Sequence, residues 1–371
     1  MLNSTIINAQ ELAEKLNIQE LIDKAIEERG HVNILIAGRS GVGKSTLINA
    51  IFEGDLAKVG QGKPVTQNTE EITAEGSPFT IFDTRGLEMA GYAETLKQLK
   101  EFVSELKRET DATKHIHIAW LCIQEENRRV EDTEIQLHEM LADYVPLITV
   151  ITKARSDNGF EADVKKLLPR ASTTVRVRSI REWIDVDDEK IELKPKGLEE
   201  LAEETAKLIP EAGQRAFISA QKASINLKIR QAKSAVKKAS FTAGAAAVTP
   251  IPFADAAVIA PIQITMMIAI SSAFGLKTSE AKLSTLISSI IGATGTTFVG
   301  RTIVTGLLKM VPGMGTVVGG AISATVATSL TAGLGNTYIS VLEHFYEQGA
   351  ETPNFEIIAE ELKRRMKNSK K

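Results

Sequence analysis

The chain has 371 residues, which is long enough for two domains. Its 44 Lys and Arg residues and 47 Asp and Glu residues give a formal net charge of −3, so no overall basic excess indicates a nucleic-acid-binding protein. The single cysteine, Cys122, excludes a disulfide framework within the chain and indicates a reducing compartment. It lies in the apolar run "HIAWLCI", where a packed thiol is expected rather than a nucleophile.

The N-terminal 31 residues contain the stretch "AQELAEKLNIQELIDKAIEE", which has the spacing of an amphipathic helix and no features of a secretory signal. From residue 32 to about residue 210, short apolar runs alternate with helical patterns. The candidate strands are "VNILIAG", "EEITAEG", "FTIFDT", "IHIAWLCI", "PLITVITK" and "TTVRVRS". This alternation predicts an α/β fold with a mostly parallel sheet. The turn at residues 76–78 is too short for a parallel crossover, so the second and third runs should form an antiparallel hairpin.

The first of these runs leads into "GRSGVGKST" at residues 38–46, which fills the spacing G-x-x-x-x-G-K-S completely. Gly41 and Gly43 allow backbone N–H groups to close on phosphate oxygens, and Lys44 can reach the outer phosphates. Ser45 offers a hydroxyl to Mg²⁺. The helical pattern that follows directs its N-terminus at the same phosphates. The residues expected to contact the nucleotide here are Gly38, Arg39, Ser40, Gly41, Val42, Gly43, Lys44, Ser45 and Thr46.

The motif "DTRG" follows the predicted hairpin. Asp83 ends a strand beside the phosphate loop, where it should hold Mg²⁺ through water. Gly86, three residues later, can give its N–H to a γ-phosphate. Between the two motifs, Thr66 lies in the polar segment "KPVTQNTEE" and can reach the metal when a triphosphate is bound. Such a segment orders around the γ-phosphate and is released after hydrolysis.

These motifs, together with "TKAR" at residues 152–155, resemble the translation-factor-related GTPases of the P-loop class, in particular the Era-like and septin-like branches. The resemblance covers about half of the chain. It implies a switch that binds GTP or GDP with Mg²⁺ and that hydrolyses GTP. By this resemblance Lys44 contacts the phosphates, Ser45 and Thr66 bind the metal, and Gly86 senses the γ-phosphate.

Two departures from the family pattern concern the base and the attacking water. Thr152 and Lys153 match the start of the base-recognition motif, but Arg155 stands where the family has the Asp that reads guanine. Guanine specificity should therefore be weaker, and Asp157 is a candidate substitute if the loop bulges. After "DTRG", Leu87 replaces the Gln that orients water in Ras-like switches, so intrinsic hydrolysis should be slow.

A third departure is Gly41, which stands where potassium-activated relatives have an Asn, so activation by that ion is not expected. The route that remains is activation in trans by a partner or by a second copy of the chain. Arg39 and Arg85 are candidates to act in that way, although exposed arginines near phosphates more often give simple electrostatic support.

Residues 210–240 carry seven Lys or Arg against one acid, which predicts a basic helix. Runs rich in Gly, Ala, Ser and Thr follow at residues 239–276, which only Asp255 interrupts with a charge, 283–300 and 310–342. They are long enough for membrane spans, which need roughly 20 apolar residues. Basic residues on both sides of this region favour cytosolic ends and attraction to anionic headgroups. Small residues suit a tightly packed soluble bundle equally well. Within these runs, Asp255 is expected to cap a helix that begins at Ala256.

The stretch "TPIPFADAAVIAPIQITMMIAIS", followed by "AFGL" and "MVPGMG", looks like a helical module found after GTPase domains in bacterial proteins of uncertain function. This second resemblance covers residues 241–349. Members of that group are commonly regarded as membrane-associated, but a shared module specifies neither a cargo nor a pathway.

We therefore expect a helical segment over residues 1–31, a GTPase domain over 32–209 and a basic helix plus a helical, membrane-directed domain over 210–371. The expected location is the cytoplasmic face of a membrane. The expected partners are a guanine nucleotide, a membrane or helical protein, and a second copy of the chain. Two alternatives remain: an assembly scaffold with little hydrolysis, or a soluble GTPase whose C-terminal bundle binds protein or RNA. RNA is the least favoured partner because the basic stretches lack interleaved aromatic residues.

Overall fold

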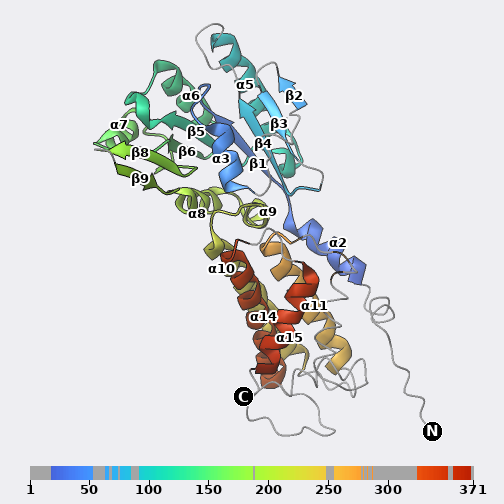
Figure 1. Cartoon of the computed structure of the whole chain (residues 1–371). Coiled ribbons are helices and arrows are strands. Elements are labelled where there is room, and N and C mark those ends of the chain that lie inside the picture. The colour runs from blue at the N-terminus through green and yellow to red at the C-terminus, as the bar shows by residue number, and fades with distance from the viewer. Residues whose placement is uncertain are drawn as a thin grey trace, which may run out of the picture. The chain divides into compact units, whose positions relative to one another are not determined.

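The computed structural model describes residues 18–52, 63–66, 69–73, 76–84, 92–186, 189–247, 255–276, 279, 282, 286, 324–349 and 354–368. Two compact units make up the chain (Figure 1). One consists of Arg29–Ser224 and is built on a β-sheet. The other consists of Met1–Glu28 with Ile225–Lys371 and is helical where it is described.

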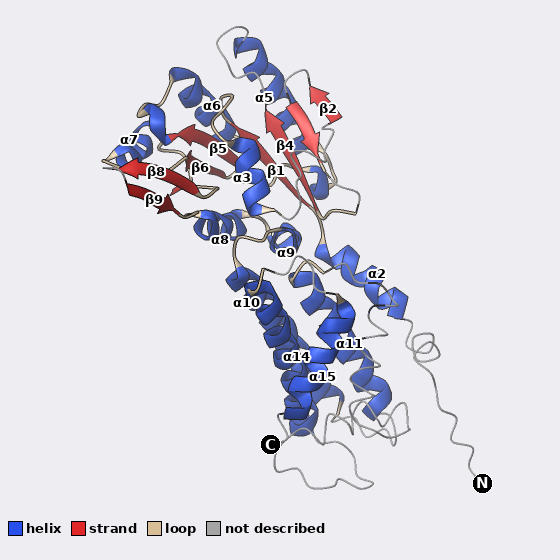
Figure 2. Ribbon diagram, viewed as in Figure 1, coloured by secondary structure: helices blue, strands red, loops and turns tan. Residues whose placement is uncertain are grey.

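The main sheet of the sheet unit has seven described strands in the order β2-β3-β4-β1-β5-β6-β7 (Figure 2). The five strands from β4 to β7 in this order pair in parallel, and β2 and β3 join one edge in antiparallel orientation. The predicted hairpin is therefore confirmed as β3 and β4. The strand bounds are β1 Val32–Ala37, β2 Lys63–Thr66, β3 Thr69–Ile72, β4 Phe79–Thr84, β5 Ile118–Gln124, β6 Leu147–Thr152 and β7 Thr173–Arg176. Strand β2 was not predicted, because its four residues carry no apolar run.

Helices cover both faces of this sheet (Figure 2). One face is covered by α5 (Tyr92–Arg108), α6 (Asp132–Ala142) and α7 (Phe160–Leu167), whose apolar residues join those of the strands in one buried cluster. The other face is covered by α3 (Lys44–Ile51), α8 (Leu198–Leu208) and α9 (Glu211–Ala220). There the Phe52 ring stacks on Phe79 with centroids 4.6 Å apart, and Trp120 donates a hydrogen bond to Thr205 at 3.1 Å. Two short 3₁₀ helices, Ala112–Lys114 and Glu125–Asn127, flank β5.

The prediction of one basic helix over residues 210–240 is wrong. Helix α9 ends at Ala220, and α10 runs from Ile225 to Ala246. Between them Lys222 donates its backbone N–H to the carbonyl of Ile51 at 2.7 Å, and the Gln221 side chain binds both the N–H and the carbonyl of Ser224. These contacts require an extended backbone at Gln221, so the helix ends there. The basic residues of 210–240 are therefore divided between the two units.

A second, two-stranded sheet of β8 (Glu182–Val186) and β9 (Glu189–Leu193) was also not predicted. Its sequence "EWIDVDDEKIEL" alternates apolar and polar residues around a polar pair, which is the pattern of a hairpin. The hairpin leaves Trp183 59% exposed. It follows β7 directly in the chain, at the end of the sheet where the base-recognition motif was predicted.

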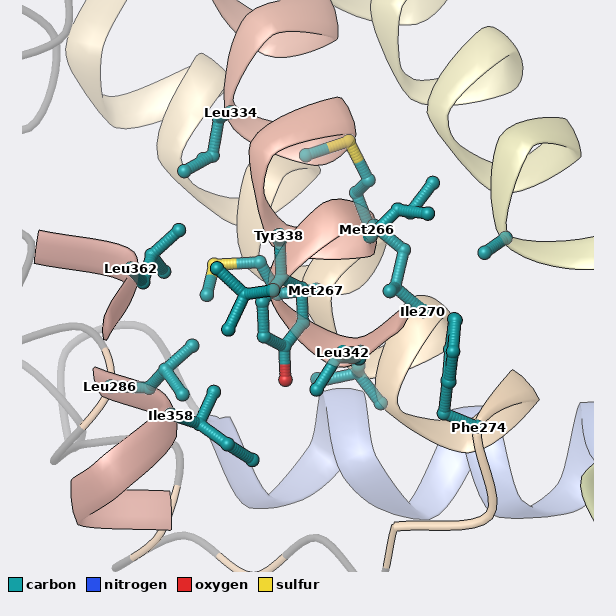
Figure 3. Packing of buried hydrophobic residues seen from close by; sticks show 14 of the residues in the cluster. Met266, Met267, Ile270, Phe274, Leu286, Leu334, Tyr338, Leu342, Ile358 and Leu362 are labelled. Carbon is teal, nitrogen blue, oxygen red and sulfur yellow. The ribbon is translucent and has the colours of Figure 1, made fainter. Parts of the chain in front are cut away.

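The described helices of the second unit pack around a large apolar core (Figure 3), and a smaller cluster is formed by Ala243, Ile259 and Ala327. These helices are α2 (Ile18–Arg29, whose last residue belongs to the sheet unit), α10, α11 (Asp255–Ala273), α14 (Ala324–Glu347) and α15 (Phe355–Asn368). Met267 and Ile270 of α11 lie against Tyr338 and Leu342 of α14 in this core. Among the α11 side chains that the structure describes, only Thr265 is exposed. Burial on all sides therefore accounts for a helix that is apolar on all sides.

Two buried polar contacts join α11 to α14. Gln263 donates its side-chain amide to the Thr331 hydroxyl at 3.2 Å, and the hydroxyls of Ser271 and Tyr338 lie 2.8 Å apart. Burial raises the pKa of the Tyr338 hydroxyl, so it stays protonated and available as a donor.

No helix within the described ranges is both long and apolar enough to cross a membrane. The predicted apolar run at 283–300 lies almost wholly outside the described residues, and the run at 310–342 is described only from residue 324, within α14. Helix α11 begins at Asp255, one residue before the predicted start, and its capping role stays a prediction because that side chain is outside the described set.

Glycines on α10 and α14 let these two helices approach closely. A Cβ atom added to Gly335 of α14 would lie 2.5 Å from Cγ2 of Val236 on α10 and 2.9 Å from Sδ of Met266 on α11. Real Cβ atoms do not come so near other atoms, so a larger residue would force these helices apart. Gly333, two positions earlier on the same helix, has no atom within 4 Å of the same added Cβ.

We predict that Gly335→Ala lowers the free energy of unfolding by about 1–3 kcal/mol through overpacking. Gly333→Ala is the matched control and should raise stability by up to about 1 kcal/mol, because alanine favours a helix over glycine. Denaturant titration of the full chain, followed by far-UV circular dichroism, compares them. Equal effects of the two substitutions would contradict the close packing at Gly335.

Candidate nucleotide-binding site

The phosphate loop joins the end of β1 to the start of α3, as the sequence predicted. Its last residue, Gly43, precedes Lys44 with a φ of 102°, in the left-handed region that favours glycine. At the other end, a Cβ on Gly38 would lie 2.5 Å from the Cys122 carbonyl oxygen. Glycine is therefore required at both ends. The N-terminus of α3 has no side-chain cap, so its backbone N–H groups face an anion-binding position.

Lys44 is almost fully buried at the first position of α3. Its ammonium donates hydrogen bonds to the carbonyl oxygens of Gly38 at 2.8 Å and Arg39 at 3.2 Å. The Nζ atom also lies 3.9 Å from Oδ1 of Asp83, at the carboxyl end of β4. The cation predicted to bind phosphate is thus held at the loop beside the carboxylate predicted to hold the metal.

A pocket of about 520 Å³ opens at this point, within the size range of ligand sites. Its lining residues are Ser40, Gly41, Gly43, Lys44, Ser45, Thr46, Asp83 and Lys153. The hydroxyl of Ser45 and the carboxylate of Asp83 bring hard oxygen donors into one pocket, and Mg²⁺ prefers such donors beside phosphate oxygens. The residues present therefore fit Mg²⁺.

The end of β6 is fastened to the phosphate loop by Thr152. Its buried hydroxyl lies 2.6 Å from the Val42 carbonyl oxygen of the loop and 3.2 Å from the Ile123 carbonyl oxygen near the end of β5. Lys153, the next residue, adopts a left-handed φ of 52° and lines the pocket. Thr152 thus acts through the loop, whereas Lys153 faces the ligand position itself.

The Arg155 side chain, at the position where the family has its guanine-reading Asp, is bound between two carboxylates. Its Nε atom lies 3.0 Å from Oε2 of Glu182 on β8, and its Nη1 atom lies 3.3 Å from Oε1 of Glu126. Glu126 also lies 3.9 Å from the Lys153 ammonium. The β8–β9 hairpin is therefore tied by an ion pair to the loop predicted to meet the base.

The buried carboxylate of Glu125 binds the backbone of this loop. Glu125 is 3% exposed, and its Oε1 accepts the backbone N–H of Arg155 at 2.6 Å. Its Oε2 accepts hydrogen bonds from Arg176 Nε at 2.9 Å and Nη2 at 2.5 Å. Sequence reasoning missed both residues. The signal is the pair of acids in "IQEEN" at the carboxyl end of a buried parallel strand, next to the strand that carries Thr152.

Asp157, the predicted substitute for the missing base-reading Asp, accepts backbone hydrogen bonds at the start of α7. Oδ1 accepts the N–H of Glu161 at 2.9 Å, and Oδ2 accepts that of Gly159 at 3.2 Å. The Glu161 N–H, together with the nearby Arg176 guanidinium, lowers the pKa of this carboxyl. Asp157 does not line the described pocket. Its role in reading the base stays a prediction.

Arg39, the other predicted contact of this loop, is not among the residues that line the pocket. Its guanidinium lies 3.2 Å from Oε1 of Glu131, which Arg129 also approaches at 2.6 Å. Glu131 is the N-terminal capping residue of α6. Arg39 is therefore paired away from the phosphate position in this structure.

Three predicted switch residues, Arg85, Gly86 and Leu87, lie outside the described residues. Thr66 ends strand β2, but its side chain is not described. Their roles stay predictions. Cys122, by contrast, is fully buried, and burial raises the pKa of its thiol to about 12, which fits a packed residue and not a nucleophile.

A glycine loop between a central parallel strand and a helix, with a strand-end carboxylate beside it, defines a P-loop nucleotide-binding protein. Residues 33–153 match the family described as "50S ribosome-binding GTPase". Residues 213–368 match the family described as "Domain of unknown function (DUF697)". The chain thus carries a P-loop GTPase domain followed by a helical region of that second family, and the resemblance drawn from the motifs is confirmed.

Curated relatives are similar over parts of the chain. The tRNA modification GTPase MnmE of Desulfotalea psychrophila is 29% identical over 135 residues, which are 36% of this chain and 27% of that protein. Septin-4 of Mus musculus is 23% identical over 204 residues, 48% of this chain and 43% of that protein. Magnetosome membrane protein 22 of Magnetospirillum gryphiswaldense is 26% identical over 123 residues, 33% of this chain and 61% of that protein. The chain spans less than two thirds of each of these relatives.

The match of residues 33–153 to a GTPase family supports GTP or GDP and Mg²⁺ as the cofactors of this site. The pocket supplies the groups that such cofactors need: a lysine for the phosphates, a hydroxyl and a carboxylate for the metal, and a helix N-terminus aimed at negative charge.

We predict that Thr152→Val weakens nucleotide binding by about tenfold, equivalent to roughly 1.4 kcal/mol, because the buried Val42 carbonyl loses its hydroxyl donor and the loop loosens. The matched control is Thr149→Val on the same strand. The Thr149 hydroxyl is buried and has no hydrogen-bond partner among the described residues, so its removal should leave affinity unchanged. Titration with a fluorescent guanine nucleotide measures both. Equal affinities of the two variants would contradict the bridging role of Thr152.

Proposed function

We propose that this protein is a GTP-binding switch that hydrolyses GTP slowly and whose nucleotide state controls a helical unit at the cytoplasmic face of a membrane. The observation that carries the proposal is the pocket in which Lys44, Ser45, Asp83 and Lys153 converge. These groups match the charge and the metal of a nucleoside triphosphate. The chain joins this pocket to a second unit whose sequence is apolar and flanked by basic residues.

In this proposal the Lys44 ammonium compensates phosphate charge, and the uncapped N-terminus of α3 donates backbone hydrogen bonds to the same phosphates. Mg²⁺, when bound, neutralises charge that develops on the β- and γ-phosphates. Ser45, Asp83 and Thr66 hold the metal, and Gly86 senses the γ-phosphate. Loss of that phosphate releases Thr66 and Gly86, which is the change that the second unit reads.

Slow hydrolysis follows from the residue after "DTRG". Leu87 has no group that can orient an attacking water, so the barrier is lowered only by the loop, the metal and whatever a partner adds. A second copy of the chain or a membrane-bound assembly can supply the missing group in trans. Arg39 is a candidate donor, since its present partner, Glu131, is a surface carboxylate shared with Arg129.

Membrane association is supported by charge and by one relative. The C-terminal stretch "KRRMKNSKK" is strongly basic, and α10 carries basic residues without an acid. One relative is named a magnetosome membrane protein. Polybasic segments of this kind are attracted to the anionic headgroups of a cytoplasmic leaflet.

We predict that the site prefers GTP over ATP, but by less than a site with Asp at the fourth motif position. Arg155 has no acceptor for the guanine N–H groups, and a site that loses a polar partner loses most of its discrimination. Competition titrations of GTP and ATP against a fluorescent guanine nucleotide measure the ratio. Equal affinities would reject guanine preference. A very large preference would contradict the weakened motif, and Asp157→Ala would then show whether that carboxylate reads the base.

We predict that hydrolysis by the dilute full chain is slow and rises when the protein is concentrated or added to anionic vesicles. Release of phosphate is measured with and without vesicles, and Lys44→Ala, which should lose nucleotide binding while remaining folded, sets the background rate. A chain that neither sediments with the vesicles nor changes its rate would overturn membrane control. Rapid hydrolysis by the dilute chain would instead overturn the role given to Leu87.

A further inference from the structure

The exposed face of α10 is a stripe of cations that ends in an aromatic ring. Arg230, Lys233 and Lys237 follow one another at three- and four-residue spacing, so they lie on one side of the helix, with Lys238 beside them. All four are exposed. Phe241, one turn further on, shares this side and is 77% exposed. We call these five residues the α10 face.

Lys233, Lys237 and Lys238 of the α10 face have no acidic neighbour on their own helix, because α10 contains no acidic residue. The neighbouring helix α14 carries its acids, Glu343 and Glu347, in its last turns. These turns lie near the start of α10, where the Lys228 ammonium stands 5.9 Å from the Tyr346 ring centroid. The opposite end of α14 packs beside the end of α10, where Gly244 meets Ala324 and Thr328. The acids of α14 are thus remote from Lys237 and Phe241.

The C-terminal part of α10 carries no charge. After Lys238 the helix carries no charged residue to its end at Ala246, and the next charge in the chain is Asp255. On the adjoining part of α14 the exposed residues are Thr325, Ser329 and Gly333, which are uncharged. Phe241 is exposed between cations and an uncharged helix end, whereas Phe274, Tyr338 and Phe355 of the same unit are buried.

We propose that the α10 face docks on a bilayer that contains anionic phospholipid, with its basic residues among the headgroups and Phe241 inserted at the boundary of the acyl chains. This assignment rests on the membrane association proposed above and names the surface that provides it. Cations beside an aromatic wedge are the chemistry by which interfacial helices bind such surfaces.

A lipid surface explains the arrangement better than RNA does. RNA-binding surfaces interleave aromatic rings with cations so that successive bases stack. The α10 face has one ring, at its end and next to uncharged residues, which matches the gradient from headgroup to acyl chain. A Phe that inserts into lipid is replaceable by Leu, whereas a Phe that stacks on a base is not.

The first test removes charge from the α10 face of the full chain. Vesicles of equal parts phosphatidylcholine and phosphatidylserine are sedimented with the protein, and vesicles of phosphatidylcholine alone give the background. The triple variant Lys233→Gln, Lys237→Gln, Lys238→Gln should bind roughly a hundredfold more weakly to the anionic vesicles. Added salt should likewise weaken the binding of the wild-type protein to the anionic vesicles.

A matched control carries the same change of net charge elsewhere. Lys97, Lys100 and Lys166 are exposed lysines of the sheet unit, and their replacement by Gln should leave vesicle binding within about twofold of wild type. Unchanged thermal unfolding of both triple variants verifies that neither effect comes from loss of the fold.

The second test examines the ring. Phe241→Ala should weaken binding to anionic vesicles about tenfold, and Phe241→Leu should restore most of that loss. The triple lysine variant binding as well as wild type would overturn the assignment of the α10 face and leave membrane association intact. Failure of the wild-type chain to bind any vesicle would overturn both. A third outcome would assign the face to nucleic acid instead. In that case the chain binds an unstructured RNA but no vesicles, the binding requires the three lysines, and Leu cannot replace Phe at position 241.

Discussion

The hydrogen bond from Thr152 to the Val42 carbonyl holds both halves of the nucleotide site in one frame. In the proposed site the phosphates lie at the loop after β1 and the base near the loop after β6, and one strand, β5, lies between β1 and β6. The 2.6 Å contact fixes the distance between those loops. Glu125 adds the second constraint, because it binds the backbone at Arg155 and the side chain of Arg176 at once. These contacts hold the two loops of the proposed nucleotide site at a fixed separation before a ligand binds.

The helical unit has a different design, in which an apolar sequence does not require lipid. Helix α11 is apolar all round because α10, α14 and α15 contribute to the core around it. Small residues allow the close approach of these helices, as Gly335 does against Val236. In the docking proposed for the α10 face, contact with a membrane depends on charges and on an aromatic residue at the surface, while the apolar helices that are described cover one another.

The parts that could be predicted from sequence are those in which local chemistry sets local structure. The loop "GRSGVGKST" needs its glycines wherever it occurs. Runs rich in β-branched residues indicate the buried strands. The break between α9 and α10 could not be predicted, because it results from a backbone hydrogen bond between Lys222 and Ile51, residues far apart in the chain. The partners of Arg155 were missed for the same reason, since Glu126 and Glu182 come to it from other elements. Long-range pairing overrides local propensity at such points.

The two polar contacts between α11 and α14 restrict how these helices can move. Surfaces of small residues can slide past one another with little change in buried apolar area. Packing alone therefore presents little energy barrier to sliding. The Gln263–Thr331 and Ser271–Tyr338 pairs lie about two helical turns apart and are satisfied together in one register. A slide breaks both pairs and leaves the buried Gln263 amide, Thr331 hydroxyl and Tyr338 hydroxyl without these partners, at a cost of about 1–3 kcal/mol for each, whereas Ser271 keeps its hydrogen bond to the Met267 carbonyl. The two pairs therefore hold α11 and α14 in one register: a slide by a whole turn, about 5.4 Å, would place Ala327 or Gly335 at the level of Thr331, and neither residue has a side chain that can bind the Gln263 amide.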